Sequence, residues 1–401
     1  MTTPWLVRWA VLIGAALAPV GAAGAGPATP PSSSPPTLAT LRIPGTPRFV
    51  AVARDVIALR FAMDPGLAAQ SGLFDDACRV PSFDPDTVRA RLARLDRDVA
   101  ALKAMPWRTW SVDRQVDWRW ILASAEDARL QLADERLFVH RPASWLEPLA
   151  NTLIALETYV PERSDLRRRL ALGIPGMVAE MRRVAVGPTR RDVTTAAGVA
   201  DGILASLRAD PPGPDRDAAV AALASYVAEL EQRQDLPEFA TIGRERYAAR
   251  LRRALLLPWD GDQLLARANA ELAATDSAMA AIKARVSPDA PMPGAPAPTP
   301  EQRELALAFD QAGLLALYDE VTRTQRAFLD TTDLVTVPGA VGPILARPTP
   351  EGMIPLTGDG GSMNPPPPVG HSNVGWWNVE HVDSTWTLEG KAGRIAAMQG
   401  F

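Results

Sequence analysis

The stretch LPEFATIGRERYAARLRRALLLPWDGDQLLARANAELAATDSAMAAIKARV, residues 236–286, decides the fold class. In its second half, apolar or small residues recur three or four positions apart, which places them on one side of an α-helix. They are Leu265, Ala268, Leu272, Thr275, Met279, Ile282 and Val286. Its first half predicts a helix over residues 241–256, with Thr241 as N-cap and Pro258 just beyond its end. The stretch therefore predicts two helices joined by a short Pro-Trp-Asp-Gly turn.

The same spacing continues over most of the chain. Asp84 followed by Pro85 is typical of a helix start, with the aspartate as N-cap. Further helices are expected at residues 111–137, 147–159, 163–186, 190–208, 215–234, 260–286 and 301–329. Pro175 falls inside one of them and is expected to kink or break it. Long helices separated by short loops predict a mainly α fold, an array of long antiparallel helices.

The pattern changes near the C-terminus, over residues 333–382, where short apolar runs are separated by turn residues. The runs are Leu334–Val337, Ile344–Ala346, Met353–Leu356 and Trp376–Val379. They predict a small antiparallel β-sheet. Residues 287–300, SPDAPMPGAPAPTP, could link two domains, but we favour a surface loop, so that residues 49–401 form a single helical domain.

The N-terminus has the pattern of a cleaved export signal. In residues 1–25, Arg8 precedes an apolar run, and Ala23-Gly24-Ala25 fits the cleavage site. The apolar run of about 12 residues is too short to span a bilayer core of about 30 Å, so a permanent anchor is the weaker interpretation. Residues 26–48 are rich in Pro and Ser and are expected to form a disordered tether. We therefore expect a periplasmic or secreted protein with no stable membrane span.

The composition argues against a nucleic-acid-binding protein and against a fold held by disulfides. The 401 residues carry a net charge of only −4, which does not indicate a nucleic-acid partner. Cys78 is the only cysteine, so no internal disulfide can form, and we expect a buried or incidental thiol. The arginine run 167–169 lies between apolar positions of a helix and is expected to be its solvated face.

Several motifs together resemble a known family. They are GRERYAARLRRALLL at 243–257, DQLLARANAEL at 262–272, RPASWLEPLA at 141–150, RRLALGIPGM at 168–177 and FLDTTDLVTVP at 328–338. Their order and spacing, over most of the chain from Phe49 onward, resemble the bacterial domain of unknown function 885. The resemblance implies a helical zinc metallopeptidase that hydrolyses peptides.

The sequence departs from that family where the metal would bind. The resemblance implies a catalytic element that looks like a helix carrying His-Glu-x-x-x-Gly-His-His, placed soon after a strand like the one around residues 376–382. The only histidines here are His140, His371 and His381, and none has a second His or a Glu at the helical spacing that aims two ligands at one metal. We therefore expect the front part of such an enzyme, either a truncated product or a degenerate paralogue, without metal ligands or a cofactor of its own, whereas complete relatives would hold zinc.

Glu380, His381 and Asp383 are weak candidates for residues that line a substrate cleft. Adjacent residues of a strand point to opposite faces, so His381 and Asp383 would share a face and Glu380 would not. One His and one Asp are too few for a catalytic zinc site. The nearby Gly-His-Ser-Asn-Val at 370–374 lacks the second glycine of a serine-hydrolase nucleophile elbow, and a polar turn is the better interpretation.

Two functions remain open. In the first, the chain carries the scaffold and cleft wall of a peptide hydrolase and is inactive alone, with the missing C-terminal half as a possible partner in trans. In the alternative, it is a non-catalytic exported helical protein that binds peptides or a protein partner. A truncated enzyme would expose an apolar surface where the absent helices dock.

Overall fold

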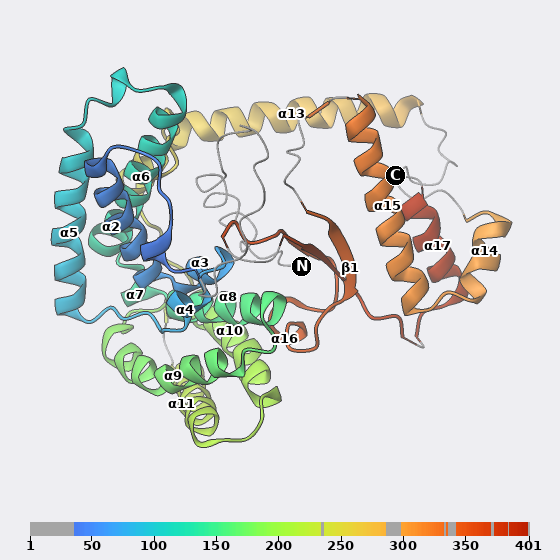
Figure 1. Ribbon diagram of the computed structural model, residues 1–401, viewed down its shortest axis with the longest axis horizontal. Coiled ribbons are helices and arrows are strands. Elements are labelled where there is room, and N and C mark those ends of the chain that lie inside the picture. The colour runs from blue at the N-terminus through green and yellow to red at the C-terminus, as the bar shows by residue number, and fades with distance from the viewer. Residues whose placement is uncertain are drawn as a thin grey trace. The chain divides into compact units, whose positions relative to one another are not determined.

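The computed structural model describes residues 36–233, 236–285, 298–332, 334–335, 342–369, 373–383 and 385–399. They belong to two compact units (Figure 1). Unit 1 is Met1–Asp262 with Pro367–His371, and unit 2 is Gln263–Pro366 with Ser372–Phe401. The expected signal sequence, residues 1–25, lies outside the described residues. None of the helices within them has the length and apolarity needed to cross a membrane.

Unit 1 is built from helices. Its α-helices are α2 (Pro47–Met63), α3 (Pro65–Gln70), α4 (Phe74–Ala77), α5 (Pro85–Lys103), α6 (Val112–Arg129), α7 (Leu137–His140), α8 (Ala143–Tyr159), α9 (Ser164–Val184), α10 (Arg190–Ala209), α11 (Pro214–Glu231) and α12 (Arg244–Ala249). Two short 3₁₀ helices, η1 (Leu38–Thr40) and η2 (Trp107–Thr109), and two π-helical segments, η3 (Leu130–Glu135) and η4 (Arg250–Ala254), complete the unit.

Unit 2 combines helices with a small sheet. Its elements are α13 (Gly261–Arg285), which begins two residues before the unit boundary, α14 (Pro300–Leu307), α15 (Gln311–Thr332), β1 (Ile344–Pro348), α16 (Ile354–Thr357), β2 (Ser362–Asn364), β3 (Gly375–Val379) and α17 (Leu388–Gln399). The predicted mainly α fold with a small sheet near the C-terminus is confirmed. Most of the expected 287–300 loop lies outside the described residues.

Local capping explains where helices begin. The Asp84 carboxylate accepts backbone N–H bonds from Asp86 and Thr87 at 3.1 and 3.0 Å, which confirms the predicted start of α5. Hydrogen bonds from Thr87 are the main reason that the pKa of Asp84 falls to about 2. The prediction for Thr241 is wrong, because α12 starts two residues later, after Gly243, whose φ is +84°. A positive φ suits glycine, which has no Cβ to clash.

Helix α9 is not broken at Pro175, in contrast to one outcome expected from the sequence. Proline removes one backbone hydrogen-bond donor and crowds the preceding turn, which usually kinks or ends a helix. Gly173 lies against Val80 so closely that a Cβ there would be 3.1 Å from both valine methyl groups. Helix α9 nevertheless continues through Pro175 and packs against α11.

The arginine run on α9 also differs from expectation. Arg167 is buried, with 8% exposure, whereas Arg168 and Arg169 are exposed. Arg167 Nε donates to Asp210 Oδ1 at 2.7 Å, and its Nη2 donates to the Ser206 carbonyl oxygen at 3.2 Å. A buried guanidinium needs such partners to offset the loss of water. The predicted solvated face is therefore wrong for Arg167, because the sequence alone does not distinguish an arginine with buried partners from one in solvent.

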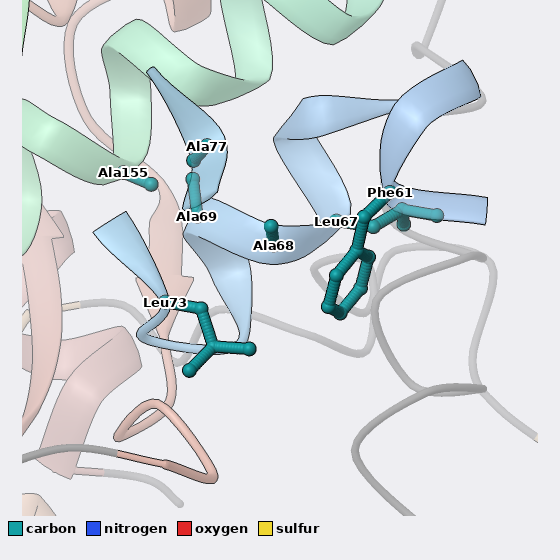
Figure 2. Packing of buried hydrophobic residues seen from close by; sticks show 7 residues of the cluster. All are labelled: Phe61, Leu67, Ala68, Ala69, Leu73, Ala77 and Ala155. Carbon is teal, nitrogen blue, oxygen red and sulfur yellow. The ribbon is translucent and has the colours of Figure 1, made fainter. Parts of the chain in front are cut away.

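One part of the unit 1 core surrounds α3. Figure 2 shows its small and apolar side chains, which pack α3 against α8. They are Phe61, Leu67, Ala68, Ala69, Leu73, Ala77 and Ala155. Leu38 and Leu41 pack against this cluster, and Leu38 N donates to Asp76 Oδ2 at 2.8 Å. The described end of the expected disordered tether, residues 36–48, therefore contributes to the core because it contains apolar residues among its prolines.

The single cysteine is buried beside the same helices. Cys78 is 7% exposed and packs with Leu156 and Leu166. Burial raises the pKa of its thiol to about 11, so the nucleophilic thiolate is scarce at neutral pH. The predicted buried thiol is confirmed.

The sheet of unit 2 has the strand order β1-β3-β2. β2 pairs with β3 antiparallel, as predicted, but β1 pairs with β3 parallel, with Leu345 opposite Trp376. The sheet is therefore mixed rather than antiparallel. Trp377 and Val379 face a core made with α14, α15 and α17, whose buried members include Phe309, Leu314 and Ile395.

Two of the four expected strands are strands. Ile344–Ala346 lies in β1 and Trp376–Val379 in β3, whereas Ile354–Leu356 forms most of the short helix α16. Met353–Leu356 is not a strand, because the N–H groups of Met353 and Ile354 donate to the Pro350 carbonyl oxygen and that of Leu356 donates to the Met353 carbonyl oxygen, which closes helical turns. Leu334 and Val335 are in a bend, and the remainder of that run lies outside the described residues.

Candidate functional site

The predicted residue His381 forms a pair with Asp359. Nδ1 of His381 lies 2.9 Å from Asp359 Oδ1, and the His381 backbone N–H donates to Asp359 Oδ2 at 3.1 Å. Both side chains are partly exposed, at 39% and 38%. Ring and backbone thus contact one carboxylate, which fixes the orientation of the imidazole.

The loop that carries His381 is held on two sides. Gln311, the first residue of α15, donates to the Glu380 carbonyl oxygen at 3.3 Å and accepts from Val382 N at 2.8 Å. On the other side lies the turn that carries Asp359, and this turn is anchored where Gly360 N donates to Thr349 Oγ1 at 2.9 Å. A Cβ on Gly360 would lie 2.6 Å from Glu380 N, so this approach requires glycine.

The other two predicted residues have separate partners. Glu380 pairs with Arg394 of α17, whose guanidinium also lies 4.1 Å from the centre of the Trp386 ring. Asp383 accepts from Thr385 N, and the hydrogen bonds from Thr385 lower the pKa of its carboxyl group. The expectation that His381 and Asp383 share one strand face does not apply, because the chain leaves β3 at Val379 and strand alternation ends there.

The pair with Asp359 defines what His381 can do. A carboxylate accepts the proton of Nδ1–H, which leaves Nε2 of the neutral ring with a free lone pair. Such an Nε2 can accept a proton or bind a metal, with the carboxylate as the group that orients it. The site therefore offers one oriented proton acceptor on the surface of unit 2.

The residues around His381 do not fit a catalytic zinc site. Zinc enzymes typically use three protein ligands, and the pair supplies one imidazole and one carboxylate already engaged by it. Across the described ranges, no group of three or more His, Cys, Asp or Glu gathers closely enough to hold a metal ion. His371 lies outside those ranges.

A polar network covers the sheet face opposite the core. Asn378 is only 2% exposed; its Oδ1 accepts from Arg347 Nε at 2.8 Å, and its Nδ2 donates to Ser362 Oγ at 3.1 Å and Asn364 Oδ1 at 2.5 Å. The Arg347 guanidinium lies 4.6 Å from the ring centre of Trp376. This face of the predicted cleft wall therefore brings together polar side chains from all three strands.

Unit 1 contains a buried ionic cluster that the sequence analysis missed. Asp127 is 4% and Glu135 8% exposed, and Arg250 contacts both: Nη1 lies 3.1 Å from Asp127 Oδ1, and Nε donates to Glu135 Oε1 at 2.8 Å. Arg60 contacts Asp127 from α2 at 3.0 Å. Arg250 belongs to the GRERYAARL motif, so the motif contains a core ion pair. Each charge of the cluster thus has an opposite charge beside it, as buried ionic groups require.

Unit 1 has two cavities whose linings include none of the predicted site residues. One, of about 400 Å³, is an open groove beside α10 and α11, lined by charged side chains that include Arg190, Asp201 and Arg233. The other, of about 320 Å³, is lined by residues that include Phe49 and Trp110.

The comparisons with known proteins identify relatives but no activity. A family model described as "Bacterial protein of unknown function (DUF885)" matches residues 65–392. No curated protein matches the chain. A solved structure described as a "putative lipoprotein of unknown function" from Shewanella oneidensis is similar, with a TM-score of 0.58 and 17% identity over 87% of this chain and 67% of that chain. At this identity the likeness shows a shared fold alone.

Proposed function

The chain belongs to the bacterial DUF885 family of unknown function, and we propose that it supplies the helical framework and one cleft wall of an exported peptide hydrolase. In this proposal the chain binds peptides but does not hold a catalytic zinc ion by itself. The observation that carries it is the His381–Asp359 pair, an oriented imidazole around which the described residues gather no set of three metal ligands, as catalytic zinc requires. A relative described as a lipoprotein supports a location in the cell envelope.

The pair assigns distinct roles to the two residues. His381 would accept a hydrogen bond or a proton from a bound peptide through Nε2, and Asp359 would keep the ring in that orientation. Asn378 and Arg347 would hold the adjacent sheet face rigid. Hydrolysis would need a metal and further ligands from another polypeptide, because zinc-activated water requires imidazole ligands and a carboxylate base together.

A peptide-retention experiment tests this proposal. The immobilised chain is incubated with a tryptic digest of casein, and retained and cleaved peptides are identified by mass spectrometry, with and without added zinc. We expect retention without new cleavage, and lower retention by His381→Ala. His140→Ala is the matched control, because this exposed histidine belongs to unit 1, where its Nδ1 lies 3.2 Å from the Gly187 carbonyl oxygen. Zinc-dependent cleavage, or equal retention by wild type and His381→Ala, would contradict the proposal.

The alternative function is a non-catalytic binding protein. Four large apolar side chains of α13 are about half exposed or more, and they form a surface that a protein partner could cover; a truncated enzyme would expose such a surface as well. The same experiment separates the two: the alternative predicts that His381→Ala leaves retention unchanged while changes on α13 reduce it.

A further inference from the structure

Helix α13 is long and has no buried residue. It spans 25 residues, or about 37 Å at 1.5 Å per residue. Exposed fractions are 61% for Leu265, 60% for Leu272, 49% for Met279 and 54% for Ile282. Helices of globular proteins are stabilised mainly by burying an apolar face, so such a stripe needs a partner surface.

The spacing of the stripe is that of a coiled coil. From Leu265 to Ile282 the residues alternate by three and four, which places Leu265, Leu272 and Met279 at a positions and Ala268, Thr275 and Ile282 at d positions. This a/d spacing presents one narrow apolar seam, the geometry that a second helix covers in a coiled coil. A second helix is therefore a partner surface that fits the stripe.

We propose that the partner is α13 of a second copy of this chain, packed antiparallel across a twofold axis between residues 273 and 274. In this register a residues meet d residues: Leu265 lies against Ile282 of the other copy, and Ala268 against Met279. Each layer thus contains at least one large apolar side chain, and the same patch serves both copies, as a twofold interface requires.

The charges beside the seam favour the antiparallel orientation. Asp262, which also pairs with Arg244 of its own chain, and Lys283 both occupy e positions. In this register Asp262 of one copy faces Lys283 of the second copy, and Lys283 faces the second copy's Asp262, which gives two opposite-charge contacts. A parallel pair in register would instead place Glu271 opposite Asp276 on both sides, and like charges there are unfavourable. The helix is thus charge-complementary to itself in the antiparallel orientation.

Sedimentation equilibrium of the purified chain tests the assembly. We expect wild type to approach twice the monomer mass with increasing concentration, and Leu272→Glu to remain at the monomer mass. Ala270→Glu is the matched control, because residue 270 is exposed on the side of α13 away from the seam, and this variant should still dimerise. Far-UV circular dichroism verifies that all three chains fold. A monomeric wild type, or a Leu272→Glu variant that dimerises like wild type, would overturn the proposal.

Cysteine cross-linking tests the orientation. Cys78 is buried, so engineered surface cysteines react selectively under native conditions. The Leu265→Cys/Ile282→Cys double variant should form a disulfide-linked dimer under mild oxidation, whereas Leu265→Cys alone should not. A dimer linked by the single Leu265→Cys variant would indicate a parallel pair and overturn the antiparallel arrangement. Protection of α13 amides from hydrogen exchange in a monomer would overturn the dimer itself, because another part of the same chain would then cover the stripe.

Discussion

Nδ1 of His381 lies 2.9 Å from Oδ1 of Asp359, although the two residues are 22 positions apart in the chain. The contact joins a loop that follows β3 to a glycine-rich turn that precedes β2. It converts an isolated histidine into an oriented one, with one ring nitrogen engaged and the other left to meet a ligand.

The Asp359 carboxylate should select the Nδ1–H tautomer of His381. In Asp359→Asn the amide can donate as well as accept, so we expect a mixture of tautomers in the neutral ring. Long-range ¹H–¹⁵N NMR spectra of the imidazoles distinguish the two forms. The His140 ring, whose Nδ1 contacts the Gly187 carbonyl oxygen, serves as the internal control and should not change. An unchanged His381 spectrum would show that Asp359 does not set the tautomer.

Alanine substitutions at Gly360 and Gly361 separate the effect of backbone strain in the turn from the effect of its contact with the His381 loop. Both have positive φ, at +88° and +76°, but a Cβ on Gly360 would lie 2.5 Å from Glu380 Cβ, whereas nothing lies within 4 Å of one on Gly361. We expect Gly361→Ala to cost about 1–2 kcal/mol of unfolding free energy from backbone strain alone. Gly360→Ala should cost roughly 1–3 kcal/mol more because it also displaces the His381 loop. Urea denaturation measures both, and equal losses would contradict the close approach of the turn to the loop.

Removing Arg250 should destabilise unit 1 strongly. Arg250→Met leaves the carboxylates of Asp127 and Glu135 buried without their main cation, which typically costs about 3–5 kcal/mol. Arg252→Met on the same segment is the control, because residue 252 is exposed and its replacement should change stability by less than about 0.5 kcal/mol. The measurement is the free energy of urea unfolding at neutral pH. Similar values for the two variants would show that the buried cluster contributes little.

Asp98 should make stability depend on pH. This residue is 8% exposed, and burial, with a further contribution from the Asp55 carboxylate, raises its pKa from 3.8 to about 6. Because the folded state binds this proton more tightly than the unfolded state, the stabilisation is complete below about pH 4 and is lost as pH rises through 6. Asp98→Asn should therefore be more stable than wild type at pH 8, by on the order of 1 kcal/mol, and the advantage should vanish near pH 4.

The control for this pH dependence is Asp96→Asn on the same helix. The Asp96 side chain is 60% exposed and pairs with Arg129, so its replacement should not stabilise the protein at pH 8. Thermal unfolding at several pH values gives the comparison. An Asp98→Asn profile parallel to that of wild type would rule out a raised pKa for Asp98.

The helices could be predicted from the sequence because apolar spacing and capping are local. The start of α5 after Asp84 and the extents of α8 to α11 follow from them within a few residues. Contacts between distant segments could not be predicted in this way. The parallel pairing of β1 with β3 depends on which strands become neighbours, and the burial of Arg167 depends on Asp210, which lies on the segment after α10.

The candidate site was predicted in part. His381 was identified because acidic residues flank it in sequence, but its partner Asp359 was not, since strand alternation indicated Asp383 instead. The signal that was available was the Gly358-Asp359-Gly360-Gly361 turn: three glycines around one aspartate indicate a backbone that another segment can approach closely. Only the structure shows that this segment is the His381 loop.

Zinc titration of the purified chain by isothermal calorimetry decides whether the chain supplies a framework with one oriented imidazole and no complete zinc site. If it does, wild type and His381→Ala should bind Zn²⁺ equally weakly, without a stoichiometric tight step. One tightly bound zinc ion per wild-type chain, lost in His381→Ala, would instead indicate a complete metal centre around His381 and contradict the role proposed for this chain.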